Sequence, residues 1–146
     1  MSSIKIDTKE FDRFVVLMDG YPSKVNTKVS EAVRESTFNI EKYAKDNLTK
    51  NGSVDTGLLR NSINSKITLL TGTVSTNTKY ARIVEEGSMP HIIKPKKKKF
   101  LYWNGASHPV KQVKHPGSKP KPYMTPALEK EEPNFIKALH KAVDLP

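Results

Sequence analysis

A long apolar stripe between residues 22 and 48 constrains the fold more than any other feature of the sequence. Its members recur three, four or seven positions apart, which is the period of one face of an α-helix. They are Val25, Val29, Ala32, Val33, Ile40, Tyr43 and Ala44. At ~1.5 Å per residue such a helix is about 40 Å long, so it needs a broad apolar partner, for which a sheet is the natural candidate. We expect it to end at Asn51-Gly52.

Two shorter helical segments flank this helix. Residues 8–19 carry apolar side chains at helical spacing. Residues 53–60 predict a turn followed by a single helical turn, with Asp55 or Thr56 as the N-cap, because the first helical N–H groups otherwise lack acceptors.

Two more helices are expected later in the chain. Residues 80–86 predict a short helix that stops at Gly87. A C-terminal helix opens at Thr125-Pro126, and Pro133 should kink it or split it in two. Its expected apolar positions are Ala127, Leu128, Phe135, Ile136, Leu139 and Val143.

Between these helices the pattern changes. Apolar and polar residues alternate from residue 63, which predicts a β-hairpin with a turn at Thr71-Gly72 and a second, Thr-rich strand over 73–78. We expect that hairpin to leave a Thr-rich edge unpaired. Residues 88–122 contain six prolines and predict an extended loop, in which only 100–103 and 110–114 are typical of strands.

The order of elements predicts an α+β fold, in which an antiparallel sheet carries a long N-terminal helix and a C-terminal helix, with an extended basic loop beside it. The 146 residues fit a single domain, 1–146. Its expected parts are a helical N-terminal part (1–50), a sheet region (51–87 and 99–114), a basic Pro-rich arm (88–122) and a C-terminal helix (124–143).

The net charge of +10 is concentrated in one segment. Between Gly87 and Leu128 there is no Asp or Glu. The same stretch holds nine lysines, which are Lys94, Lys96, Lys97, Lys98, Lys99, Lys111, Lys114, Lys119 and Lys121. This concentration predicts an anionic partner, namely nucleic acid, an acidic protein face or membrane lipid. The sequence has no signal-peptide pattern and no apolar run near the ~20 residues of a membrane span, so we expect a soluble chain without a membrane partner.

Nothing in the sequence predicts catalysis or a cofactor. Cysteine is absent, which excludes disulfides and thiolate metal sites and suits a reducing cytoplasm. The four histidines lack the close pairing of metal ligands, and no nucleophile elbow, P-loop or dinucleotide fingerprint occurs. We therefore expect no catalytic residue, no cofactor and no metal.

The candidate interaction residues lie in the basic arm. They are Lys94, Lys96, Lys97, Lys98, Lys99, Tyr102 and Trp103. Lysines beside aromatics suit a phosphate backbone with stacked bases. An alternative interpretation fits equally well. The lysines then form a solvated loop tip that meets an acidic neighbour, and the aromatics belong to a strand and enter the core.

Four motifs in order resemble a family of phage tail-component proteins. Residues 54–63, VDTGLLRNSI, are similar to that family's DTGxLRxSI stretch, and residues 80–87, YARIVEEG, to its YAxxVExG stretch. A lysine-rich hairpin and His115-Pro116-Gly117 follow, and residues 122–127, PYMTPA, resemble its P[FY]hxPA ending. The matching residues that we single out as structural are Asp55, Thr56, Gly57, Leu59, Arg60, Ser62, Tyr80, Glu85, Gly87, His115, Pro116, Gly117, Tyr123, Pro126 and Ala127.

The resemblance implies a non-enzymatic structural protein of a long-tailed phage that acts in head–tail joining or tail completion. It implies a protein that is made in the host cytoplasm, sits in the virion at the head–tail junction or tail end, and forms a ring there. Its expected partners are itself, head-connector and tail-terminator proteins, with weak DNA contact at most. The alternative is a basic nucleic-acid-binding module.

Overall fold

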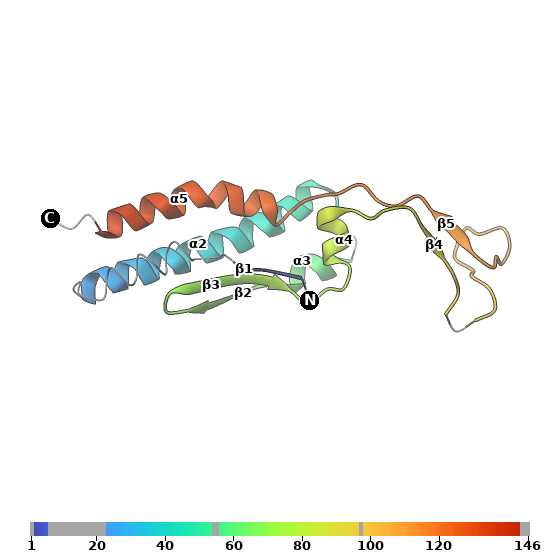
Figure 1. Cartoon of the computed structure of the whole chain (residues 1–146), viewed down its shortest axis with the longest axis horizontal. Helices are drawn as coiled ribbons and strands as arrows, with labels where there is room; N and C mark the ends of the chain where they lie inside the picture. The colour runs from blue at the N-terminus through green and yellow to red at the C-terminus, as the bar shows by residue number, and fades with distance from the viewer. Residues whose placement is uncertain (1, 6–22, 54–55, 97, 144–146) are drawn as a thin grey trace.

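The structure is a computed structural model that describes residues 2–5, 23–53, 56–96 and 98–143. The helix expected over 8–19 lies outside these residues. Figure 1 shows a layered body, in which a small sheet, a long helix and a second long helix lie one above the other, and an arm that projects beyond them. The predicted α+β class is confirmed.

The long helix α2, Ser23–Lys50, occupies the middle layer. Its predicted stripe is buried, apart from Tyr43, which is half-buried against the core. One side of α2 packs on the sheet, and another packs along the C-terminal helix. Gly52, with φ 60°, follows at the predicted end of the helix.

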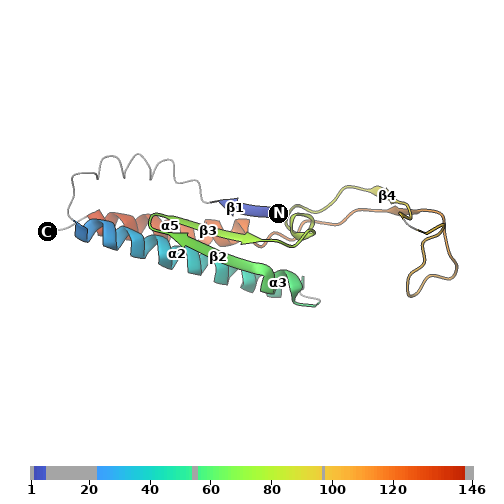
Figure 2. The ribbon, with the colours of Figure 1, turned by 90° about the horizontal axis from the view of Figure 1, so that it is seen from below.

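The main sheet is antiparallel with the strand order β1-β3-β2, where β1 is Ser2–Lys5, β2 is Ile63–Thr68 and β3 is Thr71–Thr76. Figure 2 shows these strands on the face of α2 that points toward the viewer. The predicted hairpin is confirmed. The predicted unpaired Thr-rich edge is wrong, because β3 is the central strand and β1 pairs with its second edge.

The predicted hairpin turn is also wrong. Thr68 pairs with Thr71, so the turn consists of Leu69 and Leu70, and Gly72 lies inside β3. A Cβ at Gly72 would overlap the hydroxyl of Thr37 on α2. This glycine therefore allows the helix to approach the strand closely.

Two short helices flank the β2–β3 hairpin in the chain: α3 lies between α2 and β2, and α4 lies between β3 and the arm. α3, Leu58–Ser62, has Gly57 as its N-cap at φ 75° with no side-chain cap, so the cap predicted at Asp55 or Thr56 is wrong. The Thr56 hydroxyl instead accepts a hydrogen bond from the Leu58 N–H (3.4 Å), and Asp55 lies outside the described residues. α4, Ala81–Glu86, ends at Gly87 as predicted.

The segment expected to be mostly extended loop contains a second sheet. β4, His91–Ile93, pairs antiparallel with β5, Val113–His115. The strand predicted over 100–103 is not formed, since only Leu101 makes an isolated bridge to Val110. No layer of the body covers this pair of strands, so the aromatic residues of that stretch have no core to enter (Figure 1).

The C-terminal helix α5, Thr125–Val143, runs as one helix through Pro133, so it is not split. It packs along α2 (Figure 2). One apolar cluster joins the start of α5 to the C-terminal half of α2, and the other joins the end of α5 to the start of α2, so the two helices are antiparallel. Ile136 does not belong to the buried face, because 46% of it is exposed.

Candidate functional site

The most conspicuous feature of the molecule is the basic arm, residues 88–122, which leaves the body through a narrow neck. At that neck Ser88 and Ser118 each donate a backbone N–H to the other's carbonyl oxygen, both at 3.0 Å. Their hydroxyl oxygens lie 3.0 Å apart. The two chain segments are thus held together by paired hydrogen bonds where they leave the body.

Two of the glycines that were singled out in the sequence make this close approach possible. Gly87 has φ 77° and Gly117 has φ 86°. A Cβ on Gly87 would lie 2.5 Å from the Ser118 carbonyl oxygen, and one on Gly117 would overlap the Ser88 carbonyl oxygen. Both positions therefore favour glycine for two reasons: the positive φ disfavours other residues, and the nearby carbonyl oxygen leaves no room for a Cβ.

A pair of histidines follows on the arm side of the neck. The rings of His91 and His115 are stacked across β4 and β5, with centroids 4.9 Å apart. The Gly117 N–H donates to His115 Nδ1 at 3.0 Å, and His91 Nδ1 lies 2.9 Å from the Met89 carbonyl oxygen. The imidazole of His115 thus holds the turn that contains Gly117, while Pro116 between them is exposed.

Glu85 on α4 clamps the return of the arm to the start of α5. Its carboxylate accepts hydrogen bonds from the backbone N–H groups of Tyr123 (2.7 Å), Met124 (3.0 Å) and Thr125 (2.9 Å). Partial burial raises the pKa of the Glu85 carboxyl, but these hydrogen bonds outweigh it and leave the pKa below its ordinary value. Burial and the Glu85 charge raise the pKa of Tyr123 to about 12.

Two asparagines hold the same segment, one in the last turns of α2 and one directly after the helix. Asn47 Nδ2 donates to the Tyr123 carbonyl oxygen (3.0 Å), and Asn51 Nδ2 donates to the Pro122 carbonyl oxygen (2.8 Å). The Lys121 N–H donates to the Val84 carbonyl oxygen at 2.8 Å. The sequence marked Asn51 only as part of the helix end and gave no signal for Asn47, because amide side chains near a helix end are common.

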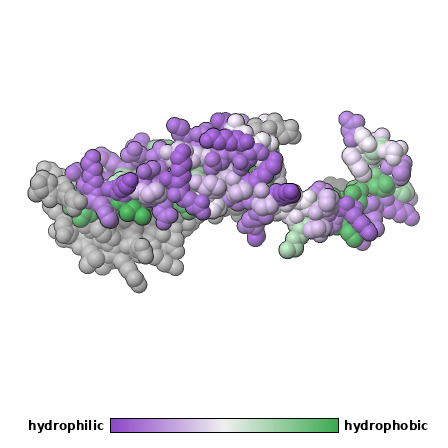
Figure 3. All heavy atoms as spheres, turned by 90° about the horizontal axis from the view of Figure 1, so that it is seen from above, coloured by the Kyte–Doolittle hydropathy of each residue, from purple (hydrophilic) through white to green (hydrophobic). Residues whose placement is uncertain are grey.

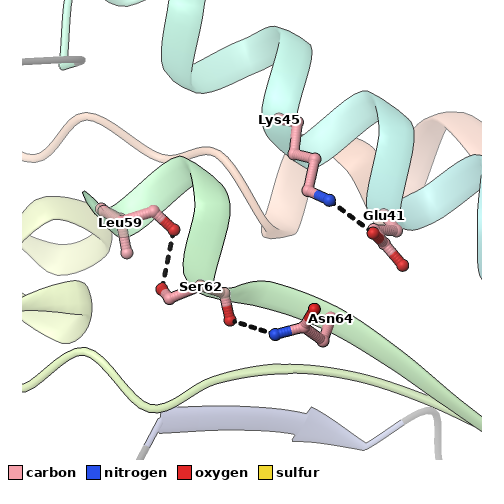
Figure 4. Close-up of polar contacts among 5 residues, drawn as sticks. All are labelled: Glu41, Lys45, Leu59, Ser62 and Asn64. Atoms are coloured by element: carbon pink, nitrogen blue, oxygen red, sulfur yellow. Dashed lines mark hydrogen bonds and ion pairs between the residues drawn. The ribbon is translucent and has the colours of Figure 1, made fainter. Parts of the chain in front are cut away.

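The described residues of the DTGxLRxSI-like motif also contribute to the place where the arm joins the body. Leu59 is buried in the same cluster as Tyr123 and Ala127. Pro126, which directly precedes Ala127, is partly buried. The Ser62 hydroxyl donates to the Leu59 carbonyl oxygen at 2.8 Å (Figure 4) and lies 2.6 Å from the hydroxyls of Thr76 and Thr78. Thr56, Gly57, Arg60 and Tyr80 line an open hollow of about 330 Å³ at the surface. The motif segments around 57–63, 80–87 and 122–127 therefore meet where the arm joins the body.

The lysines and aromatics predicted to form an interaction site lie together on the arm. Lys94, Lys96, Lys98 and Lys99 are exposed, while Lys97 lies outside the described residues. Tyr102 is 69% exposed and Trp103 is 50% exposed, so the interpretation that these aromatics enter the core is wrong. Figure 3 shows apolar and polar side chains side by side on this arm.

The described part of the chain contains no group of three or more His, Asp or Glu side chains arranged to hold a metal ion. Within the same residues, no helix combines the length and apolar character that crossing a bilayer requires.

The fold and the arm together define a class of protein: a small α+β protein with an exposed arm whose base is held to the body by hydrogen bonds. Residues 12–87, more than half of the chain, match the HK97-gp10-like family, which is described as a candidate tail component of bacteriophage HK97. The chain therefore belongs to this family, as the motifs predicted. No curated protein and no solved structure was found to match the chain.

Family membership identifies the protein as a structural component of a phage tail, and hence of the virion. The first two motifs lie within the matched residues. The arm and the PYMTPA motif lie beyond them, so the resemblance over residues 88–130 stays a prediction.

Proposed function

We propose that the protein joins heads to tails, or completes the tail, as a ring at the neck of a long-tailed phage. The observation that carries this proposal is that this tail-component protein has a projecting arm. Hydrogen bonds hold the base of the arm, and the side chains at its tip are exposed. A protein that connects two assemblies needs one surface for its own ring and another for the next assembly. The body and the arm are suited to these two tasks.

The ring contact would use the two open edges of the main sheet. In the described residues, no strand pairs with the outer edge of β2 or of β1. Because hydrogen-bonded and non-hydrogen-bonded pairs alternate from the Thr68–Thr71 turn pair, the backbone groups of Ile63, Ser65 and Ile67 point outward. The β2 edge of one subunit can pair with the β1 edge of the next, which is a head-to-tail contact that closes into a ring.

Part of the β2 edge is already satisfied from within the subunit. The Glu41 carboxylate accepts hydrogen bonds from the side chain and backbone of Ser65 and from Lys45. Burial raises the pKa of Glu41, and these interactions outweigh it so that the pKa is lowered. An edge that is partly occupied pairs weakly, so we expect an isolated subunit to stay monomeric until a connector or tail end raises its local concentration.

Deletion of the protein from the phage tests this proposal. We expect full heads and separate tails, or tails that fail to attach, with normal DNA replication and lysis. Supplying the wild-type chain should restore infectious particles, and supplying a chain with Lys96, Lys98 and Lys99 changed to Glu should not, although that variant folds. Infectious particles from the deletion strain would refute the proposal.

The alternative, a nucleic-acid-binding module, is favoured by the exposed lysines next to Tyr102 and Trp103. A gel shift at increasing salt tests it. Binding at the ~10⁻⁴–10⁻⁶ M level, weakening steeply between about 50 and 200 mM salt, is what any basic surface produces. Nanomolar, sequence-dependent binding would support the alternative over head–tail joining. In either case we propose no catalysis and no cofactor.

A further inference from the structure

We propose that the arm binds an apolar hollow on an acidic protein that is not another copy of this chain. This inference rests on the proposed function only in that the chain is assembled into a virion. The partner of the arm is then a different protein from the neighbouring subunit whose contact closes the ring.

The charge distribution argues against a second copy as the partner. The arm holds nine lysines and no acidic residue, and the remaining 16 Lys and Arg of the chain are balanced by 15 Asp and Glu. The body of another subunit therefore has no net negative charge to offer, and another arm would repel this one. Electrostatic complementarity requires a different chain with an acidic face.

The apolar residues of the arm argue for a protein partner. Met89 is 85% exposed, and Ile92, Phe100 and Trp103 are each about half exposed or more. None of the described residues of the arm is buried, because a pair of strands outside the layers of the body has no core of its own. Several exposed apolar side chains on one arm are typical of a binding surface, and Trp and Tyr contribute most when they fill desolvated pockets.

The same residues suit DNA less well. Duplex DNA attracts lysines through its phosphates but has no free base faces on which the aromatics can stack, since stacking requires unpaired bases. The arm also contains no arginine, the residue that contacts guanine edges and phosphates with two hydrogen bonds. Binding to duplex DNA would therefore leave the apolar part of this surface uncovered.

Trp103 is the only tryptophan of the chain, so its fluorescence reports on the arm alone. We expect the emission of the full-length protein to stay unchanged on addition of a short duplex at about 150 mM salt, and unchanged as the protein itself is concentrated. A shift to shorter wavelength with duplex DNA, or with rising protein concentration, would overturn the inference in favour of that partner.

Photo-crosslinking in assembled particles then identifies the partner. Tyr102 is replaced by p-benzoylphenylalanine, and the matched control carries it at Leu69, which is 73% exposed at the hairpin turn of the body. We expect the label at position 102 to yield one adduct with a different, acidic protein, and the control to lack that adduct. An adduct with a second copy or with DNA would refute the inference.

Two further variants test whether the lysine charges and the apolar side chains each contribute to formation of the adduct. Changing Phe100 and Trp103 to Ser, or Lys96, Lys98 and Lys99 to Gln, should each lower the yield about tenfold, as expected when one part of an interface is lost. Unchanged yields in both would refute the inference. An adduct with an acidic protein far from the head–tail junction would support the arm's chemistry and refute the proposed position, whereas an adduct with another copy would leave that position standing.

Discussion

The body and the arm of this protein are held in shape by different forces. The body buries two apolar clusters between α2, α5 and the sheet, and its elements are defined by what they cover. The arm buries none of its described residues. It is shaped at its base by two glycines, a paired-serine bridge and a carboxylate that accepts three backbone hydrogen bonds.

Because of this difference, we expect the stability of the fold and binding to a partner to depend on different parts of the molecule. Changes in the body should unfold the whole chain, because the clusters are shared by several elements. Changes at the neck should redirect or loosen the arm while the body stays folded. Changes at the tip should affect only binding, since nothing in the fold rests on them.

The largest effect on folding is expected from Gly72→Ala. The new methyl group would overlap the Thr37 hydroxyl and separate β3 from α2, with a loss of about 3 kcal/mol in the free energy of unfolding. Chemical denaturation followed by circular dichroism measures this loss. Adding Thr37→Ala should restore part of it, because the overlapping oxygen is removed. A fully stable single variant would show that α2 and the sheet are less closely packed than described.

A smaller and local effect is expected from Gly117→Ala. The methyl group would overlap the Ser88 carbonyl oxygen in a backbone conformation that favours glycine, with a cost of about 1–3 kcal/mol confined to the neck. Trypsin should then cut at Lys94 to Lys99 faster than in the wild type, while the unfolding midpoint of the body changes little.

Gly105→Ala is the matched control for the neck. Gly105 also has a positive φ, 93°, but a Cβ there would contact nothing within 4 Å. Wild-type and control subunits should both be cut first at Lys94 to Lys99 when free, and resist in assembled particles. Equal protection in the free and assembled states would count against an assembly role for the arm.

Glu85→Gln should weaken the clamp by about 1–2 kcal/mol, because a neutral amide oxygen accepts weaker hydrogen bonds from the three backbone N–H groups than a carboxylate does. In the wild type, the lowered pKa of Glu85 means that its contribution is complete above the ordinary value of 4.5 and is lost as the pH falls through the folded-state pKa. Amide exchange of residues 123–125, followed between pH 6 and pH 3, should become faster at low pH in the wild type. The variant should lack that pH dependence, and an identical profile in both would exclude the clamp.

The smallest effect on folding is expected at the tip. Changing Phe100, Tyr102 and Trp103 together to Ser should alter the free energy of unfolding by less than about 0.5 kcal/mol, because these side chains are exposed. Thermal unfolding measures this, and a loss of several kcal/mol would place the aromatics in a core after all.

The sequence by itself determined the elements that depend on neighbouring residues. The periodic stripe predicted α2 almost to its ends, alternation predicted the β2–β3 hairpin, and Gly87 marked the end of α4. The exposed lysines beside Tyr102 and Trp103 were also identified as one group. These features follow from local spacing, which a single stretch of chain contains in full.

Only the tertiary structure decided the features that join distant residues. Gly72 resembles a turn residue until Thr37 is placed against it, and the Thr-rich strand is central because residues 2–5 pair with it. The contacts of Glu85 with residues 123–125 cross about forty positions of the chain. No local pattern encodes such contacts, because they exist only after packing has brought the segments together.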